Sequence, residues 1–429
     1  MPEEAMPEQV MPEQVMPEQA VPPEPVRDEA APEPPPFPFP VPDGPDPAAE
    51  FGRLRAAGPV ARVRLPSGTD AWLVTRYAEN REVLAGAAFS RAAAAAAGAP
   101  RLRRVPLESG SITTLDPPEH TRLRRIVAGA FTHRRVAALR VRVAAIADEL
   151  LDGLTAGSRT ADLVGGYARP LAMTVICELL GVPRPDQDRF AALSAAYLGG
   201  AATPPEETER AAKELRGYLA ELVALRRAEP SGDLLGTLVR ARDEDRMTET
   251  ELVALGLTIL VAGFETSAGM VAGSVHALLR RDGMLDPRLA DRAALRTAVE
   301  ELLRHVAVSA AGGTIRVATR DVRLGPPGSG VTVRAGEAVL PATTSANRDP
   351  AVFAEPDRLD LTRSPNPHLA FGHGPHHCLG ASLARVELEE ALAALVRRLP
   401  ALRLAVPDAE VRWRGGGMVR GPERLPIAW

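Results

Sequence analysis

The segment HLAFGHGPHHCLGASLARVELEEAL, from His368 to Leu392, places one cysteine among four histidines and three glycines. By residue type, Cys378 could be a metal ligand, a nucleophile or a buried thiol. The three glycines let the backbone pass close to a bulky group, because glycine has no Cβ. A helical pattern begins immediately after Cys378, and a thiol at or just before a helix N-terminus is favoured as the thiolate. The segment therefore indicates a thiolate that lies beside something large.

Two other interpretations of Cys378 fit the residues less well. A buried structural cysteine does not need three glycines within nine residues. Zinc could be bound by ligands from the set His373, His376, His377 and Cys378. Zinc ligands in proteins are usually spaced as two short pairs on separate elements, however, and the chain has no second cysteine pair.

The run Phe-x-x-Gly-x-x-x-Cys-x-Gly that ends at Gly380 resembles the haem-binding loop of the cytochrome P450 family. Three further motifs follow the order of that family, so the resemblance extends over residues 37–429. It implies a mainly α fold with a small β-sheet region, in which haem b lies between a long central helix and the helix after Cys378. In this family the cysteine thiolate is the proximal ligand of the haem iron. The residues of this loop that the resemblance assigns to cofactor binding are Phe371, Gly372, Cys378 and Gly380.

A second motif is the pair Glu301 and Arg304 in AVEELLRH. The two side chains are three residues apart on a helix, so they share a face and can pair. Such a pair alone usually marks a solvated helix face. The resemblance implies instead a structural role, in which Arg358 of EPDRLD joins the pair and locks the cysteine-side structure.

A third motif, AGFETS, lies inside the longest apolar helical segment and contains Glu265 and Thr266. An acid in an apolar helix is costly unless it is satisfied or functional, and threonine can bond back to the helix carbonyl and bend it. Glu265 on a solvent-exposed face is the alternative. The resemblance implies that Glu265 and Thr266 are the oxygen-activating pair, that Ala262 and Gly263 lie against the cofactor, and that Gly263 leaves room above the iron.

Basic residues at several places match haem-carboxylate contacts of the family. His120 and Arg124 in DPPEHTRLRRIV are four apart on one helical face, and anionic propionates need cationic donors. The resemblance adds Arg316, His368 and His376 to these contacts. It assigns no task to His373 and His377.

The elements that must position these residues are mostly helices. Apolar residues recur at three and four positions over residues 135–154, 212–227, 248–281 and 293–308. Thr248 and Glu251 form a capping-box pattern that marks the start of the third of these helices. Short strand-like segments cover residues 61–66, 71–75, 314–318, 331–335 and 338–341.

Residues 1–36 have a different composition from the rest of the chain. They begin with four imperfect copies of a pentapeptide, MPEEA, MPEQV, MPEQV and MPEQA, and hold nine acidic side chains against one basic. A segment so rich in proline and glutamate cannot bury enough apolar surface to offset chain entropy. The prediction is a disordered tail over 1–36 and one catalytic domain over 37–429. That domain carries 46 acidic and 50 basic groups, so it is mildly basic.

The composition limits the compartment and the partners. Two cysteines are too few for a disulfide framework, the apolar run from Leu252 to Phe264 is shorter than a membrane span, and the start has no secretory pattern. The protein is therefore expected in the cytoplasm. We also expect it to be a monomer. The near-balanced charge gives no sign of nucleic-acid binding.

The resemblance implies a monooxygenase that inserts one oxygen atom from dioxygen into a small apolar organic substrate. Only Cys177 remains beside Cys378, so the chain cannot hold an iron–sulfur cluster, and electrons are expected from a ferredoxin and its reductase. Fifty arginines against one lysine suggest a GC-rich bacterial genome and secondary-metabolite biosynthesis. A peroxide-driven hydroxylase, an aromatic-coupling oxidase and a haem gas sensor are the alternatives. The candidate docking residues for the ferredoxin are Arg122, Arg125, Arg134 and Arg135.

Overall fold

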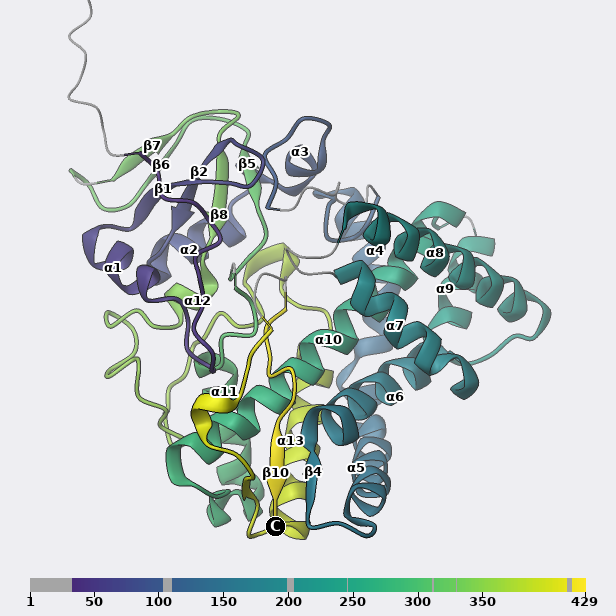
Figure 1. Ribbon diagram of the computed structural model, residues 1–429. Coiled ribbons are helices and arrows are strands. Elements are labelled where there is room, and N and C mark those ends of the chain that lie inside the picture. Colours follow the sequence, from purple (N-terminus) through teal and green to yellow (C-terminus); the bar gives the residue numbers. More distant parts are fainter. Residues whose placement is uncertain are drawn as a thin grey trace, which may run out of the picture. The chain divides into compact units, whose positions relative to one another are not determined.

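The helix α10 (Glu249–Asp282) is the longest in the part of the chain that the structure describes, and it runs through the middle of Figure 1. It begins with the predicted capping box, because the Thr248 hydroxyl accepts from the Glu251 backbone N–H and the Glu251 carboxylate accepts from that of Thr248. It ends at Gly283, which has a φ of 74°. The predicted helix over 248–281 is confirmed to within one residue at each end.

The position of α10 explains its composition. Its Leu255 and Leu260 belong to one buried apolar cluster, and its Val275 and Leu278 belong to a second. By length and hydropathy α10 could cross a membrane, but 72% of its apolar window is buried inside the protein. The apolar run is therefore that of a core helix.

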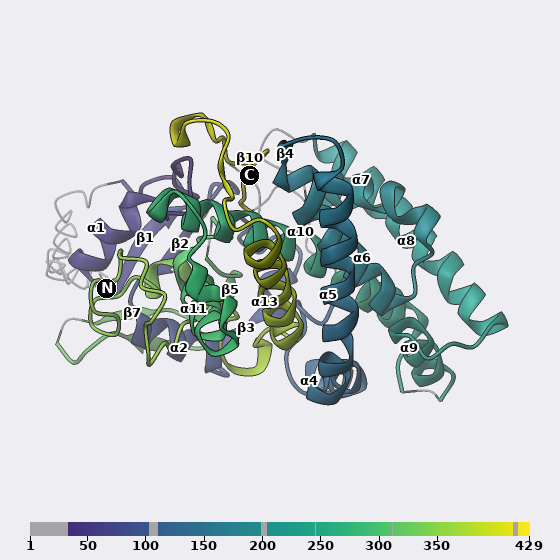
Figure 2. The ribbon, with the colours of Figure 1, turned by 90° about the horizontal axis from the view of Figure 1, so that it is seen from below.

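The helices α6, α7, α8, α9 and α13 pack against α10, and α13 packs against α5 as Figure 2 shows. The structure confirms the helices predicted over 135–154 and 212–227, and the one predicted over 293–308 ends three residues early, at His305. In the computed structural model, the remaining described α-helices are α1 (Ala49–Ala57), α2 (Tyr77–Ala85), α3 (Arg91–Ala95), α4 (Glu119–Ala128), α5 (His133–Thr155), α6 (Arg169–Leu180), α7 (Gln187–Leu198), α8 (Pro205–Ala228), α9 (Leu234–Asp243), α11 (Arg292–His305), α12 (Thr343–Ala346) and α13 (Ala381–Arg398).

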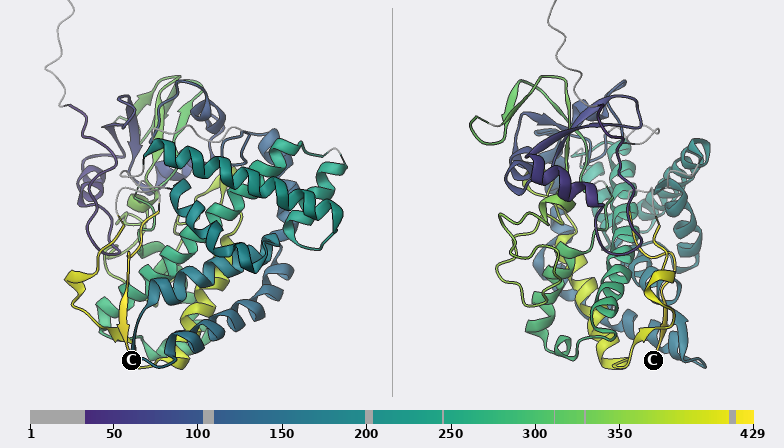
Figure 3. Two further views of the ribbon diagram at one scale, coloured as in Figure 1. Left: turned by 45° about the vertical axis from the view of Figure 1, so that its right-hand side comes forward. Right: turned by 60° about the vertical axis from the view of Figure 1, so that its left-hand side comes forward.

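The strands form small sheets, and in both views of Figure 3 the purple and light-green strands lie together, away from the blue and teal helices. The largest sheet has the order β1 (Val60–Arg64), β2 (Asp70–Val74), β8 (Ala338–Pro341), β5 (Arg316–Ala318), β3 (Phe89–Ser90). Strands β2 and β8 are parallel and the other neighbours are antiparallel. The smaller sheets contain β4 (Thr160–Asp162), β10 (Pro426–Ala428) and β9 (Arg403–Leu404), and β6 (Val322–Leu324) with β7 (Val331–Val333).

These elements confirm the predicted fold class, which is mainly α with a small β region. The five predicted strands correspond to β1, β2, β5, β7 and β8. The other described strands, β3, β4, β6, β9 and β10, were missed. Two or three residues alone cannot show an alternating pattern, and β5 and β7 were found only because apolar residues of the same kind continue beyond their ends.

The structure describes residues 33–102, 110–198, 204–244, 246–310, 312–328, 330–414 and 419–429. Residues from Pro35 onward form one compact unit. The predicted disorder of the tail concerns residues that are almost entirely outside the described ranges, so it stays a prediction, as does the division of the chain at residue 36.

Candidate active site

A cavity of about 510 Å³ lies between α10 and the loop that carries Cys378. The Cys378 side chain is solvent-accessible although its loop lies deep in the fold, because it faces this cavity. The Cys378 backbone N–H donates to the Phe371 carbonyl at 2.9 Å, which closes the loop. Of the loop residues predicted to bind a cofactor, those that line the cavity are Phe371, Cys378 and Gly380.

Two glycines allow the path of this loop. Gly372 and Gly374 both have a φ of 73°, a conformation that other residues rarely adopt. A Cβ on Gly374 would lie 2.6 Å from the Leu84 carbonyl oxygen, so the loop packs directly on the end of α2. The Arg385 guanidinium of α13 stacks over the Phe371 ring at 4.6 Å. The glycines therefore bring the loop close to neighbouring backbone, and Gly372 itself does not line the cavity.

A buried ion pair anchors the segment before this loop. The Glu301 carboxylate accepts from Arg304 at 2.7 Å, and both side chains are 0% exposed. Arg304 also donates to the carbonyls of Asn347 and Pro356, at 2.8 and 2.7 Å. The predicted pairing of Glu301 and Arg304 is confirmed, and their role in supporting the cysteine side fits these long-range contacts.

The predicted third member of this group, Arg358, is wrong. The Arg358 side chain is 64% exposed and pairs with Glu355, and only its carbonyl accepts from Arg304. Arg363 takes the expected place, because its Nε lies 3.1 Å from Glu301 Oε2 and its side chain is 10% exposed. The chain between the two arginines turns, so the register within the loop could not be derived from spacing along the sequence.

Basic side chains gather at one edge of the cavity. His120 and Arg124 of α4 line it, together with His376, and the His120 and His376 rings are 4.2 Å apart. Neither ring nitrogen of His120 has a hydrogen-bond partner among the described residues. Arg316 is 2% exposed and does not itself line the cavity.

The electrostatics of this edge favour an anion. Burial, reinforced by His120 and Arg316, lowers the pKa of His376 to about 3. Burial also lowers the pKa of Arg316 to about 9. Buried cationic groups are unfavourable unless a counter-charge is present. The nearest acid, Asp116, already accepts hydrogen bonds from the Ser90 hydroxyl and the Arg91 backbone. The carboxylates of a bound cofactor would supply the missing charge.

One residue of this basic edge was missed. Arg91 is 3% exposed, lines the cavity and donates from its Nε to the Thr113 carbonyl at 2.8 Å. Burial lowers its pKa to about 10. An arginine at the start of the alanine-rich segment from 91 to 97 has no spacing signal that would connect it to α4 or to His376, and only the fold brings them together.

The expected role of His368 is wrong in this structure. Its Nε2 lies 3.1 Å from the Glu300 carboxylate, which also pairs with Arg385 at 2.6 Å. The His368 ring is 3% exposed and does not line the cavity. It therefore cannot contact a cofactor carboxylate there. Of the two unassigned histidines, His377 lines the cavity, and its carbonyl accepts from Arg124 at 2.6 Å.

The α10 wall of the cavity contains Ala262, Gly263 and Thr266, as predicted. The Thr266 hydroxyl donates to the Ala262 carbonyl at 2.5 Å and faces the cavity. That Gly263 leaves room above the iron stays a prediction, although Gly263 does line the cavity. A Cβ there would also lie 2.6 Å from Ile176 Cδ1, so the glycine allows close packing against α6 as well.

Glu265 points away from the cavity. Its carboxylate is 3% exposed, and it pairs with Arg169 at 2.9 Å and with Arg414 at 2.8 Å. The solvent-exposed alternative is therefore excluded, because the acid is buried and ion-paired with two guanidinium groups, although its Oε1 has no hydrogen-bond partner among the described residues. Glu265 precedes Thr266 in the sequence, but the Glu265 carboxylate does not reach the cavity surface.

The zinc alternative and the second cysteine can be judged from the described residues. They contain no group of three or more His, Cys, Asp or Glu side chains arranged to hold a metal ion. Cys177 is fully buried, and burial raises its pKa to about 12. Cys378 is thus the described cysteine that can present sulfur to a ligand.

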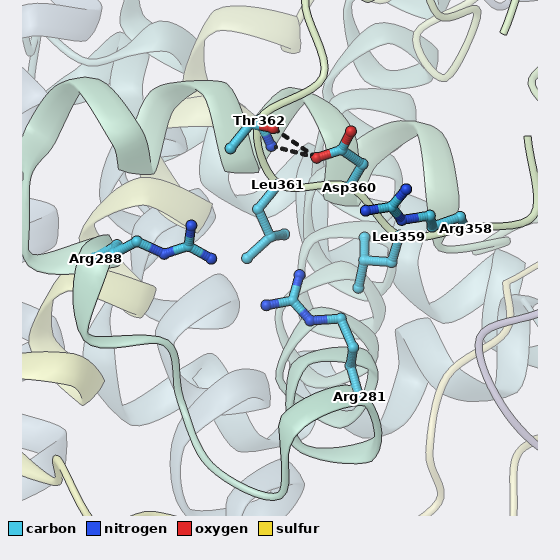
Figure 4. A pocket seen from close by; sticks show the side chains of 7 residues that line it. All are labelled: Arg281, Arg288, Arg358, Leu359, Asp360, Leu361 and Thr362. Carbon is cyan, nitrogen blue, oxygen red and sulfur yellow. Dashed lines mark hydrogen bonds between the residues drawn. The ribbon is translucent and has the colours of Figure 1, made fainter. Parts of the chain in front are cut away.

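A second cavity, of about 420 Å³, opens between the end of α10 and residues 358–362 (Figure 4). The guanidinium groups of Arg281, Arg288 and Arg358 surround it, as Figure 4 shows. Nearby carboxylates already neutralise them: Arg281 pairs with Asp282 and Asp286, Arg288 pairs with Asp286, and Arg358 pairs with Glu355. This cavity contains neither a thiol nor a histidine, so it does not compete with the cavity at Cys378.

Comparison with known proteins agrees with the geometry. The cytochrome P450 family model matches residues 280–409. Mycinamicin IV hydroxylase/epoxidase of Micromonospora griseorubida is 47% identical over 384 residues, which cover 89% of this chain and 95% of that protein. Nocardicin C N-oxygenase of Nocardia uniformis subsp. tsuyamanensis is 48% identical, with 88% and 94% covered. A crystal structure of the LnmA cytochrome P450 hydroxylase, from the leinamycin pathway of Streptomyces atroolivaceus, has a TM-score of 0.84 and 48% identity, with 92% and 99% covered.

A thiol that faces an internal cavity edged by buried cations is suited to a large anionic cofactor that takes a sulfur ligand. The chain belongs to the cytochrome P450 family. Its cofactor is haem b, and the protein is an oxidoreductase of the monooxygenase type.

Proposed function

We propose that Cys378 is the axial ligand of the haem iron and that the cavity above it binds a small, largely apolar organic substrate. The observation that carries this proposal is the accessible Cys378 side chain in a cavity whose described lining on the α10 side is mostly apolar. Haem supplies the reductive activation of dioxygen, while the protein contributes position, polarity and protons. The product would carry one oxygen atom from dioxygen, by hydroxylation or epoxidation.

We assign the haem carboxylates to the basic edge of the cavity. His120, Arg124 and His376 line this edge, with Arg91 and Arg316 close by. The unpartnered nitrogens of His120 support the assignment, because buried polar atoms are rarely left without a hydrogen bond. Binding of the cofactor would therefore satisfy groups that the fold alone leaves unsatisfied.

We propose that Thr266 and Glu265 take part in proton delivery to the cavity. Thr266 can hold a proton at Oγ1 where α10 faces the cavity. Glu265 lies behind it and is fixed by Arg169 and Arg414. Held in these two ion pairs, Glu265 would contribute to the electrostatics of α10 and to the position of Thr266.

The protein acts in bacterial secondary-metabolite biosynthesis, as its named relatives indicate. The substrate class we propose is a preformed natural product, since the relatives are named for mycinamicin IV and nocardicin C. Apolar groups on such a substrate would suit the apolar part of the cavity lining.

We propose a ferredoxin and its reductase as the electron source, and a monomer in the cytoplasm. Arg125, Arg134 and Arg135 are exposed on α4 and at the start of α5, so they are available to an acidic partner. Arg122 is less available, because it pairs with Glu251 and donates to the Arg246 carbonyl at 2.7 Å. Replacing Arg125, Arg134 and Arg135 together should raise the ferredoxin concentration needed for half-maximal turnover.

The test of the proposed function is the spectrum of the reduced protein with carbon monoxide. The wild type should show the red-shifted Soret band of thiolate-ligated haem, and Cys378→Ser should lose it together with monooxygenase activity. Cys177→Ser is the matched control, because it removes the other thiol without touching the cavity, and it should keep the band. A Cys378→Ser protein that retains haem and the wild-type band would disprove the assignment.

A further inference from the structure

Arg385 of α13 contacts the cysteine loop without lining the cavity. Its guanidinium carbon lies 4.6 Å from the centroid of the Phe371 ring, over the ring face, where the negative side of the π-system attracts a cation. Phe371 itself lines the cavity, and its carbonyl accepts from the Cys378 backbone N–H at 2.9 Å. Arg385 can therefore act on a bound cofactor only from a distance and across Phe371.

The position of the Arg385 guanidinium is fixed by several contacts. Its Nε and Nη2 donate to the two carboxylate oxygens of Glu300, at 2.6 and 2.9 Å, which is the bidentate geometry that arginine favours. Its Nη1 donates to the Ala381 carbonyl at 3.4 Å. The same carboxylate lies 3.1 Å from His368 Nε2, so it is itself held on a second side. The cation is thus kept on the Phe371 ring, although its side chain is 32% exposed.

The ion pair is oriented with its positive end toward the cysteine. Burial raises the pKa of the Cys378 thiol most strongly, and the charges of Arg124 and Arg385 act in the opposite direction. Arg124 lines the cavity, where the proposed haem carboxylates would offset its charge. Arg385 has its counter-ion on the side away from the ring, so its positive charge is felt at the cysteine loop.

A positive charge in this place has a direct consequence for electron uptake. One-electron reduction takes the haem iron from ferric to ferrous and adds one negative charge to the unit of haem and thiolate. A fixed cation nearby stabilises the reduced state more than the oxidised state. Groups around the axial ligand set the reduction potential of haem in this way without touching the iron.

We propose that Arg385, held over Phe371 by Glu300, raises the reduction potential of the haem iron and so favours uptake of the first electron. This inference rests on the proposed ligation of haem by Cys378. The electron comes from the external donor, the iron is reduced, and no bond or proton changes place in this step. Arg385 touches neither substrate nor cofactor, so it is a positioning residue.

The experiment is a spectroelectrochemical titration of the haem-loaded full chain without substrate. Arg385→Gln should lower the ratio of ferrous to ferric protein at a given potential by about tenfold, which is about 59 mV for one electron. Glu300→Gln should raise the same ratio by about threefold, because it removes a negative charge that lies further from the cysteine than Arg385 does. The opposite signs separate a field effect from a structural one. Loss of either partner of a purely structural pair would loosen the same loop and shift both potentials in one direction.

Arg397→Gln is the matched control on the same helix. The Arg397 side chain is 55% exposed, pairs with Asp148, and lies about 18 Å along α13 from Arg385, so the ratio should stay at the wild-type value. The red-shifted band of the carbon monoxide complex checks that every variant retains the thiolate ligand.

A wild-type ratio in Arg385→Gln would overturn the inference, as would shifts of the same sign in Arg385→Gln and Glu300→Gln. If Arg385→Gln takes up no haem, Glu300→Gln decides alone: an upward shift supports the inference, and an unchanged or lower ratio overturns it. Failure of the proposed function is distinct, because the wild type itself would then lack the red-shifted band.

Discussion

Behind the cysteine loop the cavity is supported by a network of buried charges, whereas on α10 glycines let neighbouring segments pack closely against the helix. On the cysteine side Glu301 accepts from Arg304, Arg363 and Asn366, and Arg304 reaches carbonyls that are more than 40 residues away. On the α10 side, a Cβ on Gly269 would lie 2.7 Å from the Arg420 carbonyl oxygen. A buried charge network tolerates few alternative arrangements, because each broken partner leaves an unpaired charge.

This difference matches the two tasks of the cavity. The sulfur of Cys378 has to be held in one place, which the ion pairs behind its loop achieve. The opposite wall has to admit an organic substrate, and small side chains on α10 leave space without imposing a charge. We therefore expect substitutions on the cysteine side to affect stability and haem content first, and substitutions on the α10 side to affect packing and turnover.

The largest expected effect tests the corrected member of the charge network. Arg363→Ala leaves Glu301 with only the Arg304 guanidinium and should lower the free energy of unfolding by about 2–3 kcal/mol, because the hydrogen bonds that Arg363 donates to a charged group are lost. It should also reduce the haem content of the purified protein, because the cysteine loop follows this segment directly. Urea titration and the haem absorbance per chain measure the two quantities.

Arg358→Ala is the matched control for that substitution. Its side chain is 64% exposed and pairs with an exposed glutamate, so the change should stay within about 0.5 kcal/mol. Equal effects of the two substitutions would mean that Arg363 does not support the network.

A smaller effect is expected on the α10 side. Gly269→Ala should destabilise the protein by about 1–3 kcal/mol, because the new methyl group meets a backbone carbonyl that cannot rotate away. Alanine has the higher helix propensity, by about 1 kcal/mol, so the packing cost has to exceed this gain.

Gly217→Ala on α8 separates the two contributions. A Cβ at Gly217 would have nothing within 4 Å, so this variant should be stabilised by up to about 1 kcal/mol. Thermal midpoints of the two variants give the comparison, and a stabilised Gly269→Ala would show that the contact with Arg420 is loose.

Much of the cysteine side was predictable from the sequence, because its motifs combine unusual residues at fixed spacing. Cys378, Glu301, Arg304, His120 and Arg124 were all placed correctly in the fold. The third arginine was misassigned, and His368 was placed at the cavity although it pairs with Glu300. Spacing along a loop does not determine which way a side chain turns.

The residues missed elsewhere depend on contacts between distant segments. Arg91 and His376 are 285 positions apart in the sequence, and Glu387 and Ser267 line the same cavity from two different helices. Nothing local distinguishes Glu387 from Glu389 or Glu390 in the run VELEEAL. Only the packing of α13 shows that Glu389 and Glu390 pair with Arg140, while Glu387 has no ion pair among the described residues.

Thr266→Ala should lower product per nicotinamide oxidised by about tenfold. This is less than the roughly 100-fold or more that general-acid catalysis typically contributes, since water can replace part of the hydroxyl's role. The fold should be retained, because the Thr266 hydroxyl bonds only within its own helix turn. Peroxide release should rise correspondingly, and added peroxide should restore part of the activity. Product, nicotinamide and peroxide are measured in the same reaction.

Thr297→Ala serves as the control, because its hydroxyl also bonds back to a helix carbonyl but lies on α11, away from the cavity. It should keep wild-type coupling. A tightly coupled Thr266→Ala would assign proton delivery to other groups on the cavity surface.

The smallest expected effect is a pH dependence on the cysteine side. Burial alone would raise the pKa of Glu300, but hydrogen bonds from Arg385 and His368 prevail and lower it from 4.5 to about 2. A carboxyl with a lowered pKa in the folded state stabilises the protein above its unfolded pKa, and this stability is lost as the pH falls from about 4.5 toward 2. Because Glu300 is partly exposed, screening reduces the effect, and we expect a loss of about 0.5 kcal/mol between pH 7 and pH 4.

Glu300→Gln should abolish this part of the pH dependence while remaining less stable than the wild type at pH 7. Urea titrations of both proteins at the two pH values provide the measurement. If both proteins lose the same stability between pH 7 and pH 4, the hydrogen bonds that Arg385 and His368 make to ionised Glu300 do not stabilise the fold.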